Sequence, residues 1–184
     1  PSGNFGNICA GVMAQKLGLP VKQFIAATNV NDIVPEYLKT GVYTPKPSKQ
    51  TISNAMDVGD PSNFIRIQEI FKNSDKTLKK HVSSYSFTDE ETKDAMVHIK
   101  KISNYIADPH GAVGYLGLKE YFKNNDGQGI FLETAHPVKF LDVVEPVLNE
   151  TIPFPPQIQE VMNNIKHVEV ISTYSELVTF LKNN

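Results

Sequence analysis

The first stretch of the chain whose residue types could do chemistry is the loop P-S-G-N-F-G-N, which contains Ser2, Gly3, Asn4, Phe5, Gly6 and Asn7. Glycines allow the backbone to turn so that successive N–H groups point into one concavity. A helix that begins directly after the loop adds unpaired donors and a partial positive charge. The pattern predicts a phosphate site that needs no lysine. An ordinary turn before a helix is the alternative, because the spacing matches neither a Walker A motif nor G-x-G-x-x-G.

A second polar group follows an apolar run near the end of the chain. Thr134, His136 and Lys139 lie in the string T-A-H-P-V-K-F, directly after G-I-F-L-E-T. Ligands of open α/β sheets gather at the carboxyl ends of the strands. A hydroxyl, an imidazole and an ammonium at that edge could bind a ring nitrogen and an anion. The alternative is a strand-to-helix turn in which Thr134 caps the helix and Lys139 faces solvent.

A third group lies in a long loop over residues 42–61, which is rich in proline, glycine and small polar residues. Loops of this length in compact domains are often functional. The loop carries Ser53, Asn54 and Asp57 in S-N-A-M-D, and Arg66 follows shortly after it. These groups fit recognition of an amino acid or a phosphate. An Asx-rich turn followed by a helix cap at Ser62 is the alternative interpretation.

The remaining candidate side chains carry weaker signals. Asn29, Asn31 and Asp32 follow a strand-like run and could contact a ligand, although a helix cap is the simpler interpretation. His110 stands at a predicted helix start, where it could approach the site. His81, His98 and His167 show no metal-ligand spacing. The single cysteine, Cys9, is expected to be a packing residue, and it excludes an internal disulfide and a cysteine-cluster zinc site.

Apolar periodicity, caps and turn residues predict the elements that position these groups. The expected strands cover residues 21–28, 129–134 and 168–171. The expected helices cover residues 8–17, 32–39, 62–71 and 138–148. Three further helices are expected: one of about fifteen residues after the capping box at 88–91, one that starts near residue 110, and a last one after residue 173. Strands that alternate with helices indicate an α/β class with a mainly parallel sheet flanked by helices.

Composition narrows the possible partners of the chain. It has 184 residues with 40% apolar and 21% charged residues, which is globular composition. The net charge is −2 and Arg66 is the only arginine among 18 basic residues. We therefore expect no nucleic-acid partner, since phosphate and base-edge contacts favour arginine. No apolar run is long enough to span a membrane, and a cytoplasmic location is expected.

Six strings in this order resemble the carboxyl-terminal part of the threonine synthase family. They are P-S-G-N-F-G-N (1–7), G-L-P-V-K-Q-F-I-A-A-T-N-V-N-D (18–32), T-I-S-N-A-M-D (51–57), P-S-N-F-I-R (61–66), D-P-H-G-A-V (108–113) and T-A-H-P-V-K-F (134–140). The family has the tryptophan-synthase-β-like fold, also called pyridoxal-phosphate fold type II. The resemblance covers residues 1 to about 140, and the tail at 141–184 has only a compatible α/β character.

The resemblance implies an enzyme that uses pyridoxal 5′-phosphate to convert O-phospho-L-homoserine and water into L-threonine and phosphate. The loop from Ser2 to Asn7 would hold the cofactor phosphate, and Thr134 would face the pyridine nitrogen. The expected substrate-side residues are Ser53, Asn54, Asp57, Arg66, His136 and Lys139.

The resemblance also implies that the Schiff-base lysine lies in an amino-terminal segment, because none of the 17 lysines matches the family's lysine motif. The chain is therefore expected to be part of a longer protein, to be inactive alone, to pack against that segment, and to self-associate when isolated. Two alternatives remain open: another pyridoxal-phosphate lyase or deaminase of the same fold, and a non-catalytic module that binds a phosphorylated ligand or a partner protein.

Overall fold

The computed structural model describes residues 1–183 and divides the chain into two compact units, residues 1–152 and the residues from Pro153 onward. The larger unit contains the elements α1 (Gly6–Lys16), β1 (Phe24–Thr28), α2 (Ile33–Thr40), η1 (Asn54–Met56), α3 (Phe64–Ile70), α4 (Asp75–His81), β2 (Val82–Ser86), α5 (Asp89–Ser103), α6 (Pro109–Tyr121), η2 (Pro137–Phe140) and α7 (Leu141–Leu148). The smaller unit contains α8 (Pro156–Gln159) and α9 (Tyr174–Asn183).

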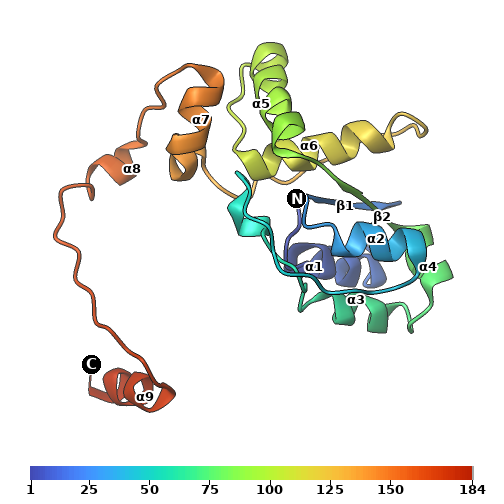
Figure 1. Ribbon diagram of the computed structural model, residues 1–184, viewed down its shortest axis with the longest axis horizontal. Helices are drawn as coiled ribbons and strands as arrows, with labels where there is room; N and C mark the ends of the chain where they lie inside the picture. The colour runs from blue at the N-terminus through green and yellow to red at the C-terminus, as the bar shows by residue number, and fades with distance from the viewer. Residues whose placement is uncertain (184) are drawn as a thin grey trace. The chain divides into compact units, whose positions relative to one another are not determined.

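The two strands of the larger unit form a parallel sheet. β1 pairs with β2 in a register that runs from Phe24 opposite Val82 to Thr28 opposite Ser86. Helices lie on both faces of this small sheet (Figure 1). The predicted α/β class with a parallel sheet flanked by helices is therefore confirmed.

Neighbouring residues of β1 face the two sides of the sheet, as strand geometry requires. Ala26 belongs to the core formed with α1, α2, α3 and α4, whereas Ala27 belongs to a second core with Met56, Phe87 and Val113. Helix α6 lies very close to the second face, since a Cβ at Gly117 would lie 2.7 Å from the Cβ of Ala27. A third core joins α5, α6 and α7 through buried residues such as Met96 and Val144.

The helices that surround the site begin at the residues that the sequence indicates. Thr88 and Glu91 form the predicted capping box of α5, with Glu91 N–H donating to Thr88 Oγ1 and Thr88 N–H donating to Glu91. Asp108 caps α6, and Pro109 occupies its first position, where the missing N–H has no cost. The helix predicted over 138–148 forms as the 3-10 turn η2 followed by α7, which contains Pro146.

Two predicted strands are absent from the structure. Residues 129–134 and 168–171 form no strand in the described part of the chain, and Ile130 and Val170 are 86% and 84% exposed. An apolar run forms a strand only where a neighbouring strand supplies hydrogen bonds, and neither segment has such a neighbour within residues 1–183. The tail at 141–184 stays a prediction, and its residues 141–152 belong to the larger compact unit.

Two elements are not indicated by the sequence pattern. Strand β2 has the sequence V-S-S-Y-S, which lacks the apolar alternation of a strand, and α4 is a short, lysine-rich helix. The helices found within residues 1–183 are all too short or too polar to cross a bilayer.

Candidate active site

The loop at residues 2–7 presents a row of free backbone donors. In the part of the chain that the structure describes, no acceptor is bound to the backbone N–H groups of residues 3–7. The N–H groups on either side are bound, because Ser2 N–H donates to Ala27 O at 2.9 Å and Ile8 N–H donates to Asn7 Oδ1 at 2.8 Å. Five consecutive unpaired donors at the start of α1 are suited to an anion.

The turn in this loop is made at Phe5 rather than at a glycine. Phe5 has φ 61° and ψ 18°, in the left-handed region, and its ring is buried against Phe64 at a centroid distance of 5.7 Å. A left-handed backbone is costly for a residue with a side chain, and such conformations gather at functional sites. The buried ring holds Phe5 in this conformation, so the direction of the free N–H groups depends on the core beneath them.

Gly3 has a different function, which is close approach to the turn η1. A Cβ at Gly3 would lie 2.6 Å from Met56 Cα and 3.1 Å from Ala55 O. No such contact exists at Gly6, where the nearest atom would be Asn63 Nδ2 at 3.6 Å. The loop at 2–7 and the S-N-A-M-D string, two of the predicted site segments, are therefore in backbone contact.

The polar side chains of the loop fix its shape. Ser2 Oγ donates to Asn7 Oδ1 at 2.6 Å, and Asn7 Nδ2 donates to Pro1 O at 2.6 Å. Asn4 Oδ1 accepts from Ser62 N–H at 2.6 Å and from Ser62 Oγ at 3.0 Å. These bonds use the Ser2 hydroxyl proton, the Asn7 amide and the oxygen of Asn4, so the donors left for a ligand are the backbone N–H groups and the exposed Asn4 amide nitrogen.

Ser53 and Asp57 take part in a buried polar network that joins the end of β1 to the loop. Asp57 accepts from Thr51 Oγ1 at 2.7 Å, from Thr51 N–H at 3.0 Å and from Asn29 Nδ2 at 2.9 Å. Ser53 is fully buried, and its Oγ lies 3.2 Å from Asn29 Nδ2. Asn31 closes the network by donating to Asn29 Oδ1 at 2.9 Å. These side chains hold the loop together, and Asn54 remains exposed beside them.

Asn29 and Asn31 thus stabilise this loop rather than cap α2. Asp32 occupies the N-cap position without a side-chain capping bond and instead pairs with Lys46 at 3.3 Å.

His110 connects the S-N-A-M-D turn to the start of α6. Its Nε2 accepts the backbone N–H of Ala55 at 3.1 Å, and its Nδ1 lies 2.6 Å from Asp108 Oδ1. The ring is buried and lies 4.7 Å from the ring of Phe140. His110 therefore touches two of the predicted site segments at once.

Two carboxyl side chains lie near His110, namely the buried Asp108 and the half-buried Glu133. Burial acts to raise the pKa of Asp108, but the hydrogen bonds from the ring and backbone of His110 outweigh it and hold that pKa below its ordinary value. Burial, together with the charge of Asp108, raises the pKa of Glu133 to about 8. Asp108 Oδ2 and both Glu133 oxygens are buried and have no hydrogen-bond partner within residues 1–183. The raised pKa of Glu133 favours its protonated form at neutral pH, beside an ionised Asp108.

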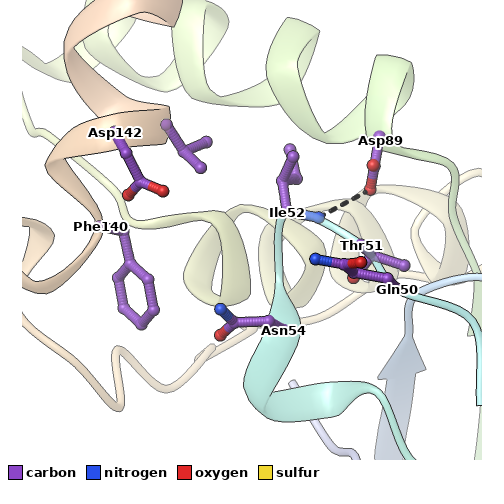
Figure 2. A pocket seen from close by; sticks show the side chains of 8 residues that line it. Gln50, Thr51, Ile52, Asn54, Asp89, Phe140 and Asp142 are labelled. Carbon is purple, nitrogen blue, oxygen red and sulfur yellow. Dashed lines mark hydrogen bonds between the residues drawn. The ribbon is translucent and has the colours of Figure 1, made fainter.

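A polar cavity of about 330 Å³ borders the turn at 54–56. Its lining comes from the loop, from the start of α5 and from the start of α7, and includes Asn54, Asp89, Phe140 and Asp142. Figure 2 shows the amide of Asn54 directed towards Phe140. The lining holds two carboxylates and no cationic side chain. The cavity alone therefore does not suit a phosphate, which would need the loop donors or a lysine at its edge.

The predicted residues after residue 133 are accessible. Thr134, His136 and Lys139 are exposed, and His136 Nδ1 caps η2 by accepting from Val138 N–H at 3.2 Å. Lys139 forms no ion pair within residues 1–183. Phe131 and Pro1 both lie against Gly114, at 3.6 Å and 2.8 Å from where its Cβ would be. The segment that leads to Thr134 thus meets the start of the loop at residues 2–7, called the anion loop below, on one side of α6.

The structure brings three predicted segments together, namely 2–7, 53–57 and 134–140, around His110 and α6. Arg66 is exposed on α3, and no side-chain hydrogen bond or ion pair links it to these segments within residues 1–183. Cys9 is buried in the core, as predicted. His81 stacks on Phe71 and His98 lies beside Tyr115, which agrees with packing roles.

Comparison with known proteins decides the relationship. Residues 111–180 match the family model described as "Threonine synthase, C-terminal". Threonine synthase from Escherichia coli K12 is 46% identical over 161 residues, and that from Buchnera aphidicola of Acyrthosiphon pisum is 41% identical over 187 residues. The chain is homologous to the carboxyl-terminal region of threonine synthases.

Solved structures of threonine synthases agree with this relationship. The crystal structure of the Escherichia coli enzyme matches the whole chain with a TM-score of 0.83 and 41% identity. The pyridoxal-phosphate-bound threonine synthase of Brucella melitensis matches 98% of the chain with a TM-score of 0.81 and 29% identity. The alignment with the Escherichia coli threonine synthase includes 87% of this chain but only 37% of that protein.

The side chains that the sequence does not single out are those that support the threonine synthase motifs. Thr51, Asp108 and Glu133 lie inside or beside these motifs, but no local pattern indicates their role, because support of this kind depends on contacts between distant segments. The one available signal was Asp108-Pro109, a cap pattern that fixes the start of the helix bearing His110.

Proposed function

We propose that this chain is the carboxyl-terminal part of a pyridoxal-phosphate-dependent threonine synthase that converts O-phospho-L-homoserine and water into L-threonine and phosphate. The observation that carries the proposal is the row of five unpaired backbone donors at residues 3–7, in a chain homologous to threonine synthases. The donor set fits the cofactor, whose phosphate is a dianion with no need of a lysine at a helix start.

In this proposal the loop holds the cofactor phosphate through the N–H groups of residues 3–7. Thr134 presents its hydroxyl to the pyridine nitrogen, while burial and the charge of Asp108 raise the pKa of its neighbour Glu133. A hydroxyl exerts no charge on the ring nitrogen, so it does not favour a permanently protonated ring as a carboxylate would. When bound, the cofactor acts as the electron sink for removal of protons from the substrate.

The substrate side is formed by the turn at 53–57 and by the segment at 136–139. Asn54 is the accessible amide of the turn, and Ser53 and Asp57 place it through the buried network. Lys139, with no ion partner in the described chain, supplies the positive charge for the substrate phosphate, and His136 lies beside it. Arg66 is the weakest member of the predicted set, since no described contact links it to the other site residues.

The lysine that binds the cofactor covalently is proposed to lie in the region of the protein that precedes this chain, and that region is proposed to pack against it. Additional strands from the same region would pair with the exposed apolar segment at 129–134. A cytoplasmic location and self-association of the isolated chain also remain predictions.

The test uses the full-length protein purified with pyridoxal phosphate. We expect phosphate release and threonine formation from O-phospho-L-homoserine, and no deamination of serine or threonine at a comparable rate. Activity on serine or threonine alone would favour another lyase of the same fold. Absence of cofactor absorbance and of all turnover would favour a non-catalytic binding module and would overturn the proposal.

A further inference from the structure

The protonation state of the His110 ring follows from its two partners. The partner of Nε2 is the backbone N–H of Ala55, which can only donate, at 3.1 Å. Nε2 must therefore be the unprotonated nitrogen. Nδ1 then carries the ring proton and donates it to Asp108 Oδ1 at 2.6 Å. Asp108 also accepts the backbone N–H of His110 at 2.8 Å, so one buried carboxylate fixes both the ring and its backbone.

Ala55 is held on two sides. Its N–H is bound by His110, and its carbonyl oxygen lies 3.1 Å from where a Cβ of Gly3 would be. The residue before it, Asn54, lines the cavity on the side of Phe140, against which the His110 ring also packs. A shift of Ala55 would therefore move Asn54 within the cavity.

We propose that His110 is a positioning residue for the substrate-side turn, holding Ala55 through Nε2 so that Asn54 is directed into the cavity. This inference rests on the proposed function and deepens it, since it assigns the position of the substrate-side amide to a residue that does not touch the substrate. Asp108 holds the ring in the required tautomer through Oδ1.

A matched pair of variants separates the two ends of the ring. In His110→Gln the side-chain oxygen reaches the place of Nε2 and can still accept from Ala55. In His110→Asn the side chain reaches only the place of Nδ1, so the Ala55 N–H loses its acceptor. His98→Asn is the control, because His98 is exposed on α5 and its ring lies 6.0 Å from the Tyr115 ring.

In the full-length enzyme we expect His110→Asn to raise KM for O-phospho-L-homoserine about tenfold, as expected for loss of one buried hydrogen bond, with kcat changed much less. His110→Gln should return KM to within about threefold of wild type, and His98→Asn should leave it unchanged. A general loss of packing would not give this rescue. Equal KM values for the Gln and Asn variants, or an effect on kcat alone, would overturn the inference.

A second measurement needs neither variant nor activity. Long-range proton–nitrogen NMR correlation on the wild-type protein reports which ring nitrogen carries the proton. We expect His110 to be the Nδ1–H tautomer, and a protonated Nε2 would overturn the inference. An inactive wild-type enzyme that still gives the Nδ1–H tautomer would instead count against the proposed function alone.

Discussion

Gly3 and Met56 belong to segments far apart in the sequence, yet a Cβ on Gly3 would lie 2.6 Å from the Met56 Cα. Because the contacting atoms are backbone and cannot rotate away, Gly3→Ala must displace either the anion loop or the turn η1. Gly6 lies in the same loop and has ordinary space around its Cβ position. These two glycines therefore make a matched pair.

We expect Gly3→Ala to lower the free energy of unfolding by about 1–3 kcal/mol, the usual cost of overpacking, and to weaken binding of pyridoxal phosphate. Gly6→Ala should change the free energy of unfolding by less than about 0.5 kcal/mol. Urea unfolding of both variants, with cofactor titration by absorbance, measures the difference. Equal behaviour of the two variants would contradict the close backbone contact.

Asp57 is expected to be required for the stability of the loop. Asp57→Asn would turn an amide donor towards Thr51 N–H or Asn29 Nδ2, both of which donate to Asp57. The expected loss in the free energy of unfolding is about 2–3 kcal/mol. Asp60→Asn is the control, since exposed Asp60 accepts one bond from Tyr43 and Asn can still accept it. A cost for Asp57→Asn no greater than for Asp60→Asn would show that the network contributes little.

Lys139 is expected to act on the substrate and not on stability. Its side chain is exposed and has no ion partner in residues 1–183, so Lys139→Ala should leave thermal unfolding unchanged. Loss of a charged hydrogen bond to the substrate phosphate should raise KM about 10- to 100-fold. Lys101→Ala, at an exposed position of α5, is the control for a simple change in net charge. An unchanged KM would remove Lys139 from the substrate site.

Glu133 should make stability depend on pH in a defined window. Its pKa is raised from the ordinary 4.5 to about 8, so the folded chain retains a proton that the unfolded chain releases. The free energy of unfolding should therefore be highest below pH 4.5 as far as this group is concerned, fall as pH rises, and level off above pH 8.

Glu133→Gln removes this titration while keeping the shape of the protonated acid. Above pH 8 we expect the variant to be more stable by about 1–2 kcal/mol, a reduced figure because the side chain is only half-buried. Urea unfolding at several pH values measures this. A difference between wild type and variant that stays constant with pH would contradict the raised pKa of Glu133.

The sequence was most informative where one short segment determines the outcome. Thr88 and Glu91 are neighbours on one turn, so the capping box at α5 could be predicted, and Asp108-Pro109 similarly predicted the start of α6. The parallel α/β class was predicted correctly, although of the three expected strands only the one at 21–28 forms, and its partner β2 was not indicated by the sequence.

Predictions that depended on distant partners were harder to make. The run at 129–134 has a strand-like composition but no strand beside it in the described chain, and Ile130 is 86% exposed. Ser53 and Asp57 could be recognised as polar groups in a functional loop, but only the fold shows that Asn29 reaches them. The contact of His110 with Ala55 likewise joins segments whose proximity no local pattern contains.

The parallel pairing of Phe24 with Val82 has a consequence for the order of folding. Closing so long a stretch of chain costs entropy before any contact is gained, so this pairing is expected to be slow compared with formation of the helices. Ser2 N–H binds Ala27 O on β1, and α6 packs on the same strand at Gly117. The anion loop therefore has no surface to pack against until the strands have paired. We expect cofactor binding to appear only in the last phase of refolding.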